Sequence, residues 1–376
     1  MHRFCYNSLK ILCKGQEGIT VEPRCNNIFT LIDEALKLNA SDLHISVGIP
    51  PTCRVNGHLR PLPFARVDPR DAETYAAQLL NENQLRHLNE TGEIDTSITS
   101  YEKYRCRINI FRQKSWYSLA IRMLNPVIKD FKALGLPPVL EDLCSLNRGL
   151  ILITGPTGAG KTTTLAAMVD WINSNRDCHI VTLEDPIEYV HEHKRSIVNQ
   201  REIGYDSLSY ANALRAVLRQ DPDVILIGEM RDLDSISIAL TAAETGHLVL
   251  STLHTIGASK TIDRIIDVFP PFQQQQIRTQ LSMVLQAVIS QQLIPTLDGK
   301  SRVLATEVMI TTPAIKNMIR DNKIHQISNV IQTSGKLFMK SMDASLLELV
   351  RERKISIENA LVYASDPEHM KKMLSY

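Results

Sequence analysis

The chain has 376 residues, of which 44% are hydrophobic and 22% are charged, and its formal net charge is +1. This length is more than one ordinary core accommodates and predicts two domains, while the composition excludes disordered and fibrous chains. Because the net charge is close to zero, nothing draws the chain as a whole to nucleic acid or anionic lipid, and we expect no nucleic-acid partner.

Cysteine usage and hydropathy predict a cytoplasmic protein. There are seven cysteines, an odd number, and no two of them have C-x-x-C spacing, so neither a disulfide framework nor a zinc site is indicated. No apolar run approaches the roughly 18 residues of a membrane span. The best runs, such as that over 224–227, have the length of a strand, and we expect no transmembrane segment.

The first third of the chain predicts a small α+β domain over 27–123, preceded by an extension over 1–26 that has no clear periodicity. Helical spacing of apolar residues, alternation along short strands and turn residues mark the elements of this domain. In chain order we expect a helix over 28–38, strands over 42–47 and 53–55, a helical stretch over 70–90, and a strand pair over 105–111 and 118–122.

A segment rich in proline and glycine over 124–138 predicts a linker, and a second domain follows over 139–376. Continuous apolar runs that alternate with helical segments are typical of parallel strands covered by helices on both faces, which makes the fold class α/β. After Pro270 and Pro271 we expect mostly helices. The apolar strands are expected over 150–154, 180–183, 224–227 and 248–251.

The most informative motif follows the first of these strands. Gly155-x4-Gly160-Lys161-Thr162 fills every fixed position of the P-loop pattern, between an apolar strand and a helix rich in alanine and leucine. In such a loop, backbone N–H groups and the helix N-terminus surround phosphate oxygens, the lysine reaches the β- and γ-phosphates, and the threonine hydroxyl holds Mg²⁺. We therefore expect ATP and Mg²⁺ as ligands. The expected nucleotide-binding residues are Gly155, Pro156, Thr157, Gly158, Ala159, Gly160, Lys161, Thr162 and Thr163.

Three carboxylates gather after the strand over 180–183. Glu184, Asp185 and Glu188 stand at the carboxyl end of a parallel strand, where ligands of such sheets bind. Clustered acids are paired, solvated or directed at a metal, and otherwise one of them acquires a raised pKa. A solvated loop is the alternative for this cluster alone, but a P-loop in the same sheet favours a catalytic site.

The strand over 224–227 has the form of a Walker B strand, in which apolar residues lead to an acid near the metal. Gly228 stands where a simple Walker B strand has aspartate, and Glu229 follows it. We therefore expect Glu229 to act on Mg²⁺ through water. Either Glu184 or Glu229 can position or deprotonate the attacking water; we favour Glu184 as the base and Glu229 as the organiser of the metal shell.

Two histidines bracket the strand over 248–251. His254, at its carboxyl end, is expected to contact the γ-phosphate or relay its loss. His247, at the other end, is expected to be structural or to lie at a subunit contact.

Together these four segments resemble the Walker A, Asp box, Walker B and His box of secretion ATPases, the superfamily of type II secretion and type IV pilus motors. The resemblance covers about 27–370. Ala40-Ser-Asp-Leu-His44 and Arg54-Val-Asn-Gly57 are typical of its pilus-retraction branch, the PilT type. The segment Ala314-Ile-Lys-Asn-Met-Ile-Arg-Asp321 resembles that branch's Ala-Ile-Arg-Asn-Leu-Ile-Arg-Glu signature, with three conservative differences. The chain also lacks the tetracysteine insertion that is common in assembly and secretion ATPases.

This resemblance implies a RecA-like P-loop core with C-terminal helices, preceded by a PAS-like α+β domain, and assembly into a homohexamer. It also implies that arginines of the first domain complete the active site. Arg107 and Arg122 lie on the expected strand pair and are the favoured candidates, with Arg105 and Arg112 as further ones. Such arginines would stabilise transition-state charge and couple hydrolysis to rotation of one domain against the other across the linker.

The function implied by the resemblance is an ATP-hydrolysing motor that retracts type IV pili and thereby drives twitching motility. Its partner would be an inner-membrane pilus platform protein, which places the motor in the cytoplasm, peripheral at the inner membrane. Two alternatives belong to the same superfamily: a pilus-assembly or type II secretion ATPase, and a non-hydrolysing accessory subunit that binds ATP. A nucleic-acid translocase is disfavoured by the near-neutral charge.

Overall fold

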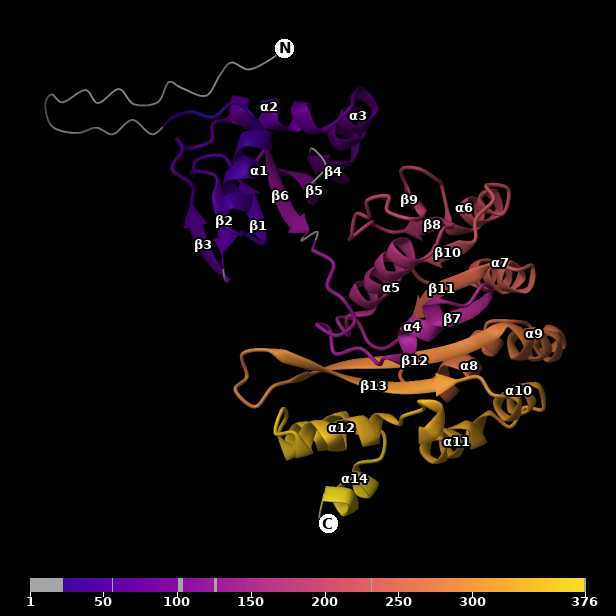
Figure 1. The fold of residues 1–376 in the computed structure, drawn as a ribbon. Coiled ribbons are helices and arrows are strands. Elements are labelled where there is room, and N and C mark those ends of the chain that lie inside the picture. The colour runs from indigo at the N-terminus through magenta and orange to yellow at the C-terminus, as the bar shows by residue number, and fades with distance from the viewer. Residues whose placement is uncertain (1–22, 56, 101–103, 125–126, 231, 375–376) are drawn as a thin grey trace, which may run out of the picture. The chain divides into compact units, whose positions relative to one another are not determined.

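Two compact units make up the chain, 1–125 and 126–376. Most of the expected extension, 1–22, lies outside the described residues, as do Asn56 and Arg231. The computed structural model describes residues 23–55, 57–100, 104–124, 127–230 and 232–374 (Figure 1).

The first unit is an α+β unit built on an antiparallel sheet in the order β3-β2-β1-β6-β5-β4. The unit's elements are α1 (Ile28–Lys37), β1 (Asp42–Ile45), β2 (Thr52–Val55), β3 (His58–Pro61), α2 (Pro69–Leu79), α3 (Glu82–Thr91), β4 (Glu93–Ser100), β5 (Tyr104–Gln113) and β6 (Trp116–Leu124). Alternate positions of the strands, such as Ile108 and Ile110, point into a core shared with α1 and α2. The small α+β domain that the sequence predicts is therefore present.

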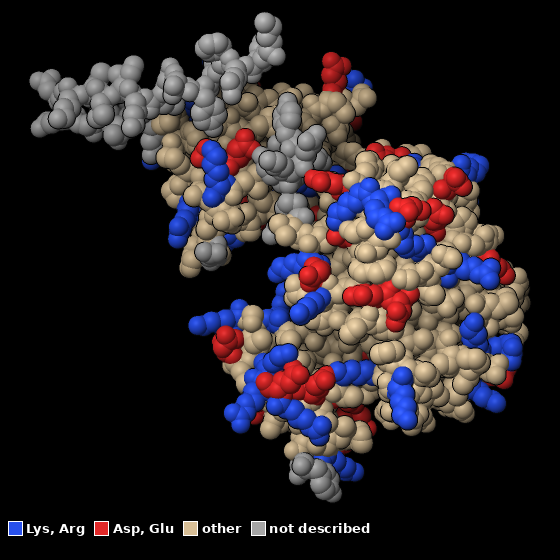
Figure 2. Space-filling model, in the orientation of Figure 1, with Lys and Arg blue, Asp and Glu red and all other residues tan. Residues whose placement is uncertain are grey.

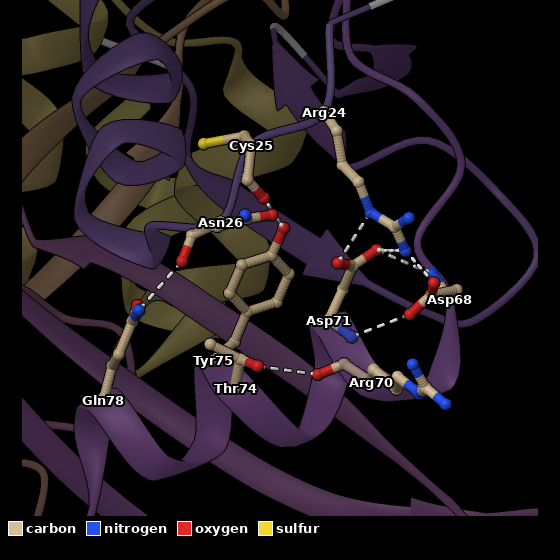
Figure 3. Close-up of polar contacts among 9 residues, drawn as sticks. All are labelled: Arg24, Cys25, Asn26, Asp68, Arg70, Asp71, Thr74, Tyr75 and Gln78. Carbon is tan, nitrogen blue, oxygen red and sulfur yellow. Dashed lines mark hydrogen bonds and ion pairs between the residues drawn. The ribbon is translucent and has the colours of Figure 1, made fainter.

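Helix α2 begins at a capping box whose two carboxylates also bind Arg24. The Asp68 carboxylate accepts from the backbone N–H of Asp71 at 2.9 Å, and the Asp71 carboxylate accepts from the backbone N–H of Asp68 at 3.0 Å. Arg24 donates to both oxygens of Asp71, at 3.0 and 3.1 Å, and also pairs with Asp68 (Figure 3). One nearly buried carboxylate thus joins a helix start to a segment 47 positions earlier in the chain.

Further contacts to α2 extend this attachment through residues 25 and 26. The Tyr75 hydroxyl donates to the carbonyl of Cys25, and the Gln78 amide donates to the carbonyl of Asn26 at 2.8 Å (Figure 3). Burial raises the pKa of Tyr75 to about 12, so its hydroxyl remains a donor at neutral pH. The last residues of the expected extension are therefore packed against the first unit.

The second unit is built on a seven-stranded sheet in the order β13-β12-β7-β11-β10-β8-β9. Neighbouring strands pair in parallel, except for the antiparallel pair of β12 and β13. The strands are β7 (Gly149–Thr154), β8 (His179–Glu184), β9 (Ile197–Glu202), β10 (Val224–Ile227), β11 (Leu248–Leu253), β12 (Leu285–Pro295) and β13 (Arg302–Ile310). The helices are α4 (Val139–Cys144), α5 (Lys161–Asn175), α6 (Tyr210–Val217), α7 (Leu233–Glu244), α8 (Ala258–Asp267), α9 (Pro271–Val284), α10 (Pro313–Arg320), α11 (Ile327–Thr333), α12 (Met342–Arg351), α13 (Ile357–Tyr363) and α14 (Pro367–Leu374), with short 3₁₀ turns over Ile324–Gln326 and Gly335–Leu337.

Helices cover both faces of this sheet, as its continuous apolar strands predict. Leu150 and Leu152 of β7 point into a core with α6 to α10, whereas Ile151 and Ile153 point into a second core with α4 and α5. Phe131, from the expected linker, packs into the second of these cores. A smaller core joins α12 to α14 to the hairpin of β12 and β13.

Two strands of the large sheet lie where the sequence led us to expect mostly helices. β12 and β13 follow α9 and extend the sheet beyond β7. The middle of β12 carries Ser290, Gln291 and Gln292, all of them buried polar residues, and this polar interruption hides the strand pattern. Gln291 is accommodated because its amide exchanges hydrogen bonds with the Thr164 hydroxyl, at 2.8 and 3.2 Å.

The surface of the second unit mixes the two signs of charge. On the face in view, Lys and Arg side chains lie interspersed with Asp and Glu (Figure 2). Ion pairs of this unit include Lys194 with Asp170 at 2.6 Å and Arg195 with Asp177 at 2.9 Å. Within the described ranges, no helix is both long and apolar enough to span a membrane.

Replacing Asp71 with alanine is expected to lower the free energy of unfolding of the first unit by about 1–3 kcal/mol, because it removes the capping box and both Arg24 bonds. The chain has two tryptophans, and Trp116 lies in the first unit while Trp171 lies in the second. Urea unfolding followed by fluorescence in a Trp171→Phe background therefore reports on the first unit. Glu73→Ala, on the exposed side of α2, is the control, and equal stability of the two variants would contradict this account.

Candidate active site

The P-loop lies between β7 and α5 and surrounds the head of its own lysine. The Lys161 ammonium donates to the carbonyl oxygens of Gly155 and Pro156, at 2.8 and 3.1 Å. Burial lowers the pKa of Lys161, and the nearby carboxylate of Glu229 opposes this effect. The loop therefore presents a cation at the start of α5, where the backbone N–H groups of the helix also point.

Glycine at position 155 is required by a close approach between the P-loop and β12. A Cβ atom at Gly155 would lie 2.3 Å from the carbonyl oxygen of Gln291 in β12, and the residue's φ is +141°. No side chain fits there without moving β12, so the first fixed position of the motif is set by packing as well as by phosphate binding.

Glu184, at the end of β8, and Glu229, just after β10, line the same cavity. Glu184, the last residue of β8, is 9% exposed, and its Oε1 atom accepts from Thr182 at 2.6 Å and from Gln200 at 3.1 Å. Glu229 follows β10, and its Oε2 atom lies 3.1 Å from Nε2 of His254. Their side chains are 14% and 55% exposed, respectively, so the carboxylate is held inside while the imidazole faces the opening.

The two histidines that bracket β11 have different surroundings. His254 lines the cavity, whereas Nδ1 of His247 lies 2.9 Å from the carbonyl oxygen of Ala242, near the end of α7. His247 therefore contacts the C-terminal turn of that helix, at the opposite end of the strand from His254.

Most of the expected nucleotide-binding and acidic residues line one cavity of about 500 Å³. Gly155 and Pro156 contribute their carbonyls to the loop beneath it, and Ala159 is buried. The expected residues that line the cavity are Thr157, Gly158, Gly160, Lys161, Thr162, Thr163, Glu184, Asp185, Glu188, Glu229 and His254.

Arg107 and Arg122 belong to the first unit. They face each other directly across β5 and β6, and both are exposed. Arg122 donates to Asp42 at 3.2 Å. Burial of Asp42 works to raise its pKa, but hydrogen bonds from Ser41 and Arg122 outweigh burial and leave the pKa lowered. Of the further candidates, Arg105 donates to Ser97 at 2.8 Å.

Several cavity residues were not anticipated from the sequence, because they belong to no motif. They are Tyr189, His191, Tyr210, Leu293 and Arg302. Burial lowers the pKa of His191 to about 4, so its ring is neutral at neutral pH. Leu293 and Arg302 come from β12 and β13, two strands that the sequence pattern does not indicate.

The donor set of the cavity suits Mg²⁺. The Thr162 hydroxyl lines the cavity and makes no hydrogen bond to any other residue the structure describes. The carboxylate-bearing residue Glu229 lines the same cavity. This set matches an ion that keeps several waters and binds phosphate oxygens together with one or two protein oxygens.

Little space remains beside Gly228, which stands where a simple Walker B strand has aspartate. A Cβ atom there would lie 3.0 Å from the Tyr210 hydroxyl and 3.3 Å from the carbonyl oxygen of Leu183. The backbone of Gly228 also donates to Leu183 at 2.8 Å and accepts from the Thr252 hydroxyl at 2.6 Å. The glycine thus brings the ends of β8, β10 and β11 together and places Glu229 immediately beyond them.

Gly228→Ala is expected to lower the free energy of unfolding of the second unit by about 1–3 kcal/mol, because the added methyl overpacks this junction. Urea unfolding followed at Trp171 in a Trp116→Phe background measures the change. Gly335→Ala is the matched control, since a Cβ there meets nothing within 4 Å. If the two variants are equally stable, the junction does not exclude a side chain.

Comparison with known proteins identifies the family of this chain. The family model described as type II/IV secretion system protein matches residues 20–342. The type IV pilus retraction ATPase PilT of Pseudomonas aeruginosa is 46% identical over 343 residues, which cover 91% of this chain and 99% of that protein. A twitching motility protein of Neisseria gonorrhoeae is 44% identical over 320 residues, or 85% of this chain and 86% of its own length.

Comparison with a solved structure shows that the similarity extends to the fold. The crystal structure of the pilus retraction motor PilT with bound ADP superposes with a TM-score of 0.86 at 46% identity, over 92% of this chain and 99% of that one. The expected fold, a RecA-like core with C-terminal helices after a small α+β domain, is thereby confirmed. The chain belongs to the family of type II/IV secretion system proteins and is a secretion-family ATPase.

Proposed function

We propose that this protein is the ATP-driven motor of type IV pilus retraction, acting as a homohexameric ring. One observation carries the proposal: Lys161, Glu184, Glu229 and His254 meet in one cavity. The fold around that cavity is shared with PilT over nearly the whole of both chains. A P-loop alone binds phosphate, but a P-loop facing two carboxylates has the groups that hydrolysis needs.

Binding begins at the P-loop. The phosphates of ATP are cradled by the backbone of 155–160 and by Lys161, whose ammonium already faces into the loop. Thr162 and, through water, Glu229 are the residues that would hold Mg²⁺, which neutralises the charge of the phosphate oxygens when bound. His254 orients Glu229 through their contact.

In the hydrolytic step, the oxygen of a water molecule forms a bond to the γ-phosphorus as the bond from that phosphorus to the bridging oxygen breaks. ADP leaves with the electron pair, and the proton of the water passes to Glu184. General-base assistance of this kind contributes about 10²–10⁴ in rate. Glu184 is preferred over Glu229 because Glu229, which contacts His254, is assigned to the metal shell.

Arg107 and Arg122 would complete the site as sources of positive charge for the transition state. Their exposed positions on adjacent strands leave them accessible to a nucleotide phosphate. We propose that they supply this charge when one domain rotates against the other across 124–138. Hydrolysis would then depend on the state of the ring.

The mechanical output is assigned by analogy with PilT. We propose that the ring acts from the cytoplasm, peripheral at the inner membrane, on a platform protein of the pilus machine. The domain limits 27–123 and 139–376, with the linker between them, are part of this proposal.

Three single substitutions test the chemistry. Lys161→Ala is expected to weaken ATP binding and turnover together, since it removes the cation of the loop. Glu184→Gln and Glu229→Gln are expected to keep ATP binding and to lower turnover at least about 100-fold, as loss of a base or of the metal shell would. Phosphate release and nucleotide affinity are measured on the intact protein with Mg²⁺. Near-wild-type turnover in any of the three variants would refute the assigned role.

A deletion in the host distinguishes retraction from the rival functions. Loss of a retraction motor leaves surface pili without twitching, whereas loss of an assembly motor leaves cells without pili. Deletion and complementation with Lys161→Ala, scored by microscopy of pili and by twitching zones, make the comparison. Piliated, non-twitching cells are expected; cells without pili would indicate assembly. A wild-type protein that binds ATP and releases no phosphate would indicate an accessory subunit.

A further inference from the structure

We propose that Thr182 and Gln200 are positioning residues that hold the Glu184 carboxylate, through its Oε1 atom, in the orientation in which it accepts the proton of the attacking water. The inference rests on the proposed hydrolytic function and assigns two residues outside all four motifs. Its basis is the hydrogen-bond network at the carboxyl ends of β8 and β9.

Strand geometry brings these three side chains to one face of the sheet. Successive residues of a strand point to opposite faces, so Thr182 and Glu184 of β8 point the same way. In the parallel pair of β8 and β9, Thr182 lies opposite Gln200. Gln200 therefore stands beside both residues, although 16 positions of sequence separate it from Glu184.

Both donors act on the same carboxylate oxygen. The Thr182 hydroxyl, which is fully buried, donates to Oε1 of Glu184 at 2.6 Å, and the Gln200 amide donates to that atom at 3.1 Å. A short bond from an O–H group to a carboxylate is among the stronger hydrogen bonds in proteins. Two donors on one oxygen fix the rotation of the carboxylate about its last bond, so the second oxygen keeps a constant direction.

The orientation of the Gln200 amide is itself determined by its partners. Its Oε1 atom accepts from the backbone N–H of His191 at 2.8 Å, and its Nε2 atom also donates to the carbonyl oxygen of Tyr189 at 2.8 Å. If the amide were flipped, its NH₂ group would face the backbone N–H of His191, and its oxygen would face the carbonyl oxygen of Tyr189 and Oε1 of Glu184. Gln200 can therefore present only its N–H to Glu184.

The same network extends to the helix of the P-loop. The Tyr189 hydroxyl lies 3.0 Å from the hydroxyl of Thr163 in α5. Gln200 thus joins Glu184 to a segment that also contacts the first turn of α5. This arrangement fixes the position of the Glu184 carboxylate relative to the P-loop. A displacement of a catalytic group by about 1 Å can lower the rate about 10²-fold.

The test uses Thr182→Val, which keeps the shape of the side chain and removes only the donor, together with Gln200→Leu. Each is expected to lower kcat about 10–100-fold while KM and nucleotide affinity change less than about twofold. Thr182→Ser restores the hydroxyl and is expected to restore kcat. Asn199→Ala, on the opposite face of the same strand, is the control and should match the wild type.

A double-mutant cycle makes the assignment specific to Glu184. In a Glu184→Gln background, Thr182→Val should lower the residual kcat no further, because no carboxylate remains to be positioned. A kcat within twofold of wild type in Thr182→Val, failure of the serine to rescue, or a full additional loss in the Glu184→Gln background each overturns this inference alone. Absence of phosphate release by the wild-type protein overturns the proposed function as well.

Discussion

The common edge at which β7, β8, β10 and β11 end is the constraint on which the site depends. These strands pair in parallel in register, with Thr154 opposite Leu253 and Ile227 opposite Leu183 and Ser251. Whatever follows each strand must therefore emerge at the same side of the sheet. The P-loop, the acids and His254 come from separate segments, and this register alone gathers them into one cavity.

Close backbone packing at two glycines brings the segments at that edge near one another. Gly155 allows the loop to pass against the carbonyl of Gln291, and Gly228 allows β10 to end beside Leu183 and Tyr210. A side chain at position 155 would push the P-loop away from β12. A side chain at position 228 would push the end of β10, and with it Glu229, away from β8. The two glycines thus have a spatial role in addition to their role in the motifs, and Glu229 follows directly after the second of them.

The elements nearest to sequence motifs were the most predictable. The strand before the P-loop, the strands before Glu184 and Glu229, and the helix over 28–38 follow from apolar periodicity, which local sequence records. By contrast, β9 and β12 carry polar residues, such as the half-buried Gln200 and the buried Gln291, whose side chains are paired within the fold. Their partners lie far away in the sequence, so no local pattern identifies them as strand residues. The single helical stretch expected over 70–90 is in fact α2 and α3, separated at Leu80 and Asn81.

The same reasoning explains which parts of the site were not foreseen. Lys161, Glu184 and His254 stand in recognisable segments, whereas Thr182 and Gln200 meet Glu184 only through the pairing of β8 with β9. Arg302 lines the cavity because β13 is part of the sheet, and β13 lies in the region that was expected to be mostly helical. Motifs thus indicate which residues line the site, and tertiary pairing determines which residues contact them.

The central claim is that one cavity brings a phosphate cradle and a general base to the same phosphate. A crystal structure of the intact protein with Mg²⁺ and a non-hydrolysable ATP analogue tests it most directly. The account predicts the γ-phosphate at Lys161, the metal at Thr162, and a water in line with the γ-phosphorus within about 2.6–3.2 Å of Glu184. A γ-phosphate bound away from Lys161, or a Glu184 carboxylate turned from that water, would contradict it.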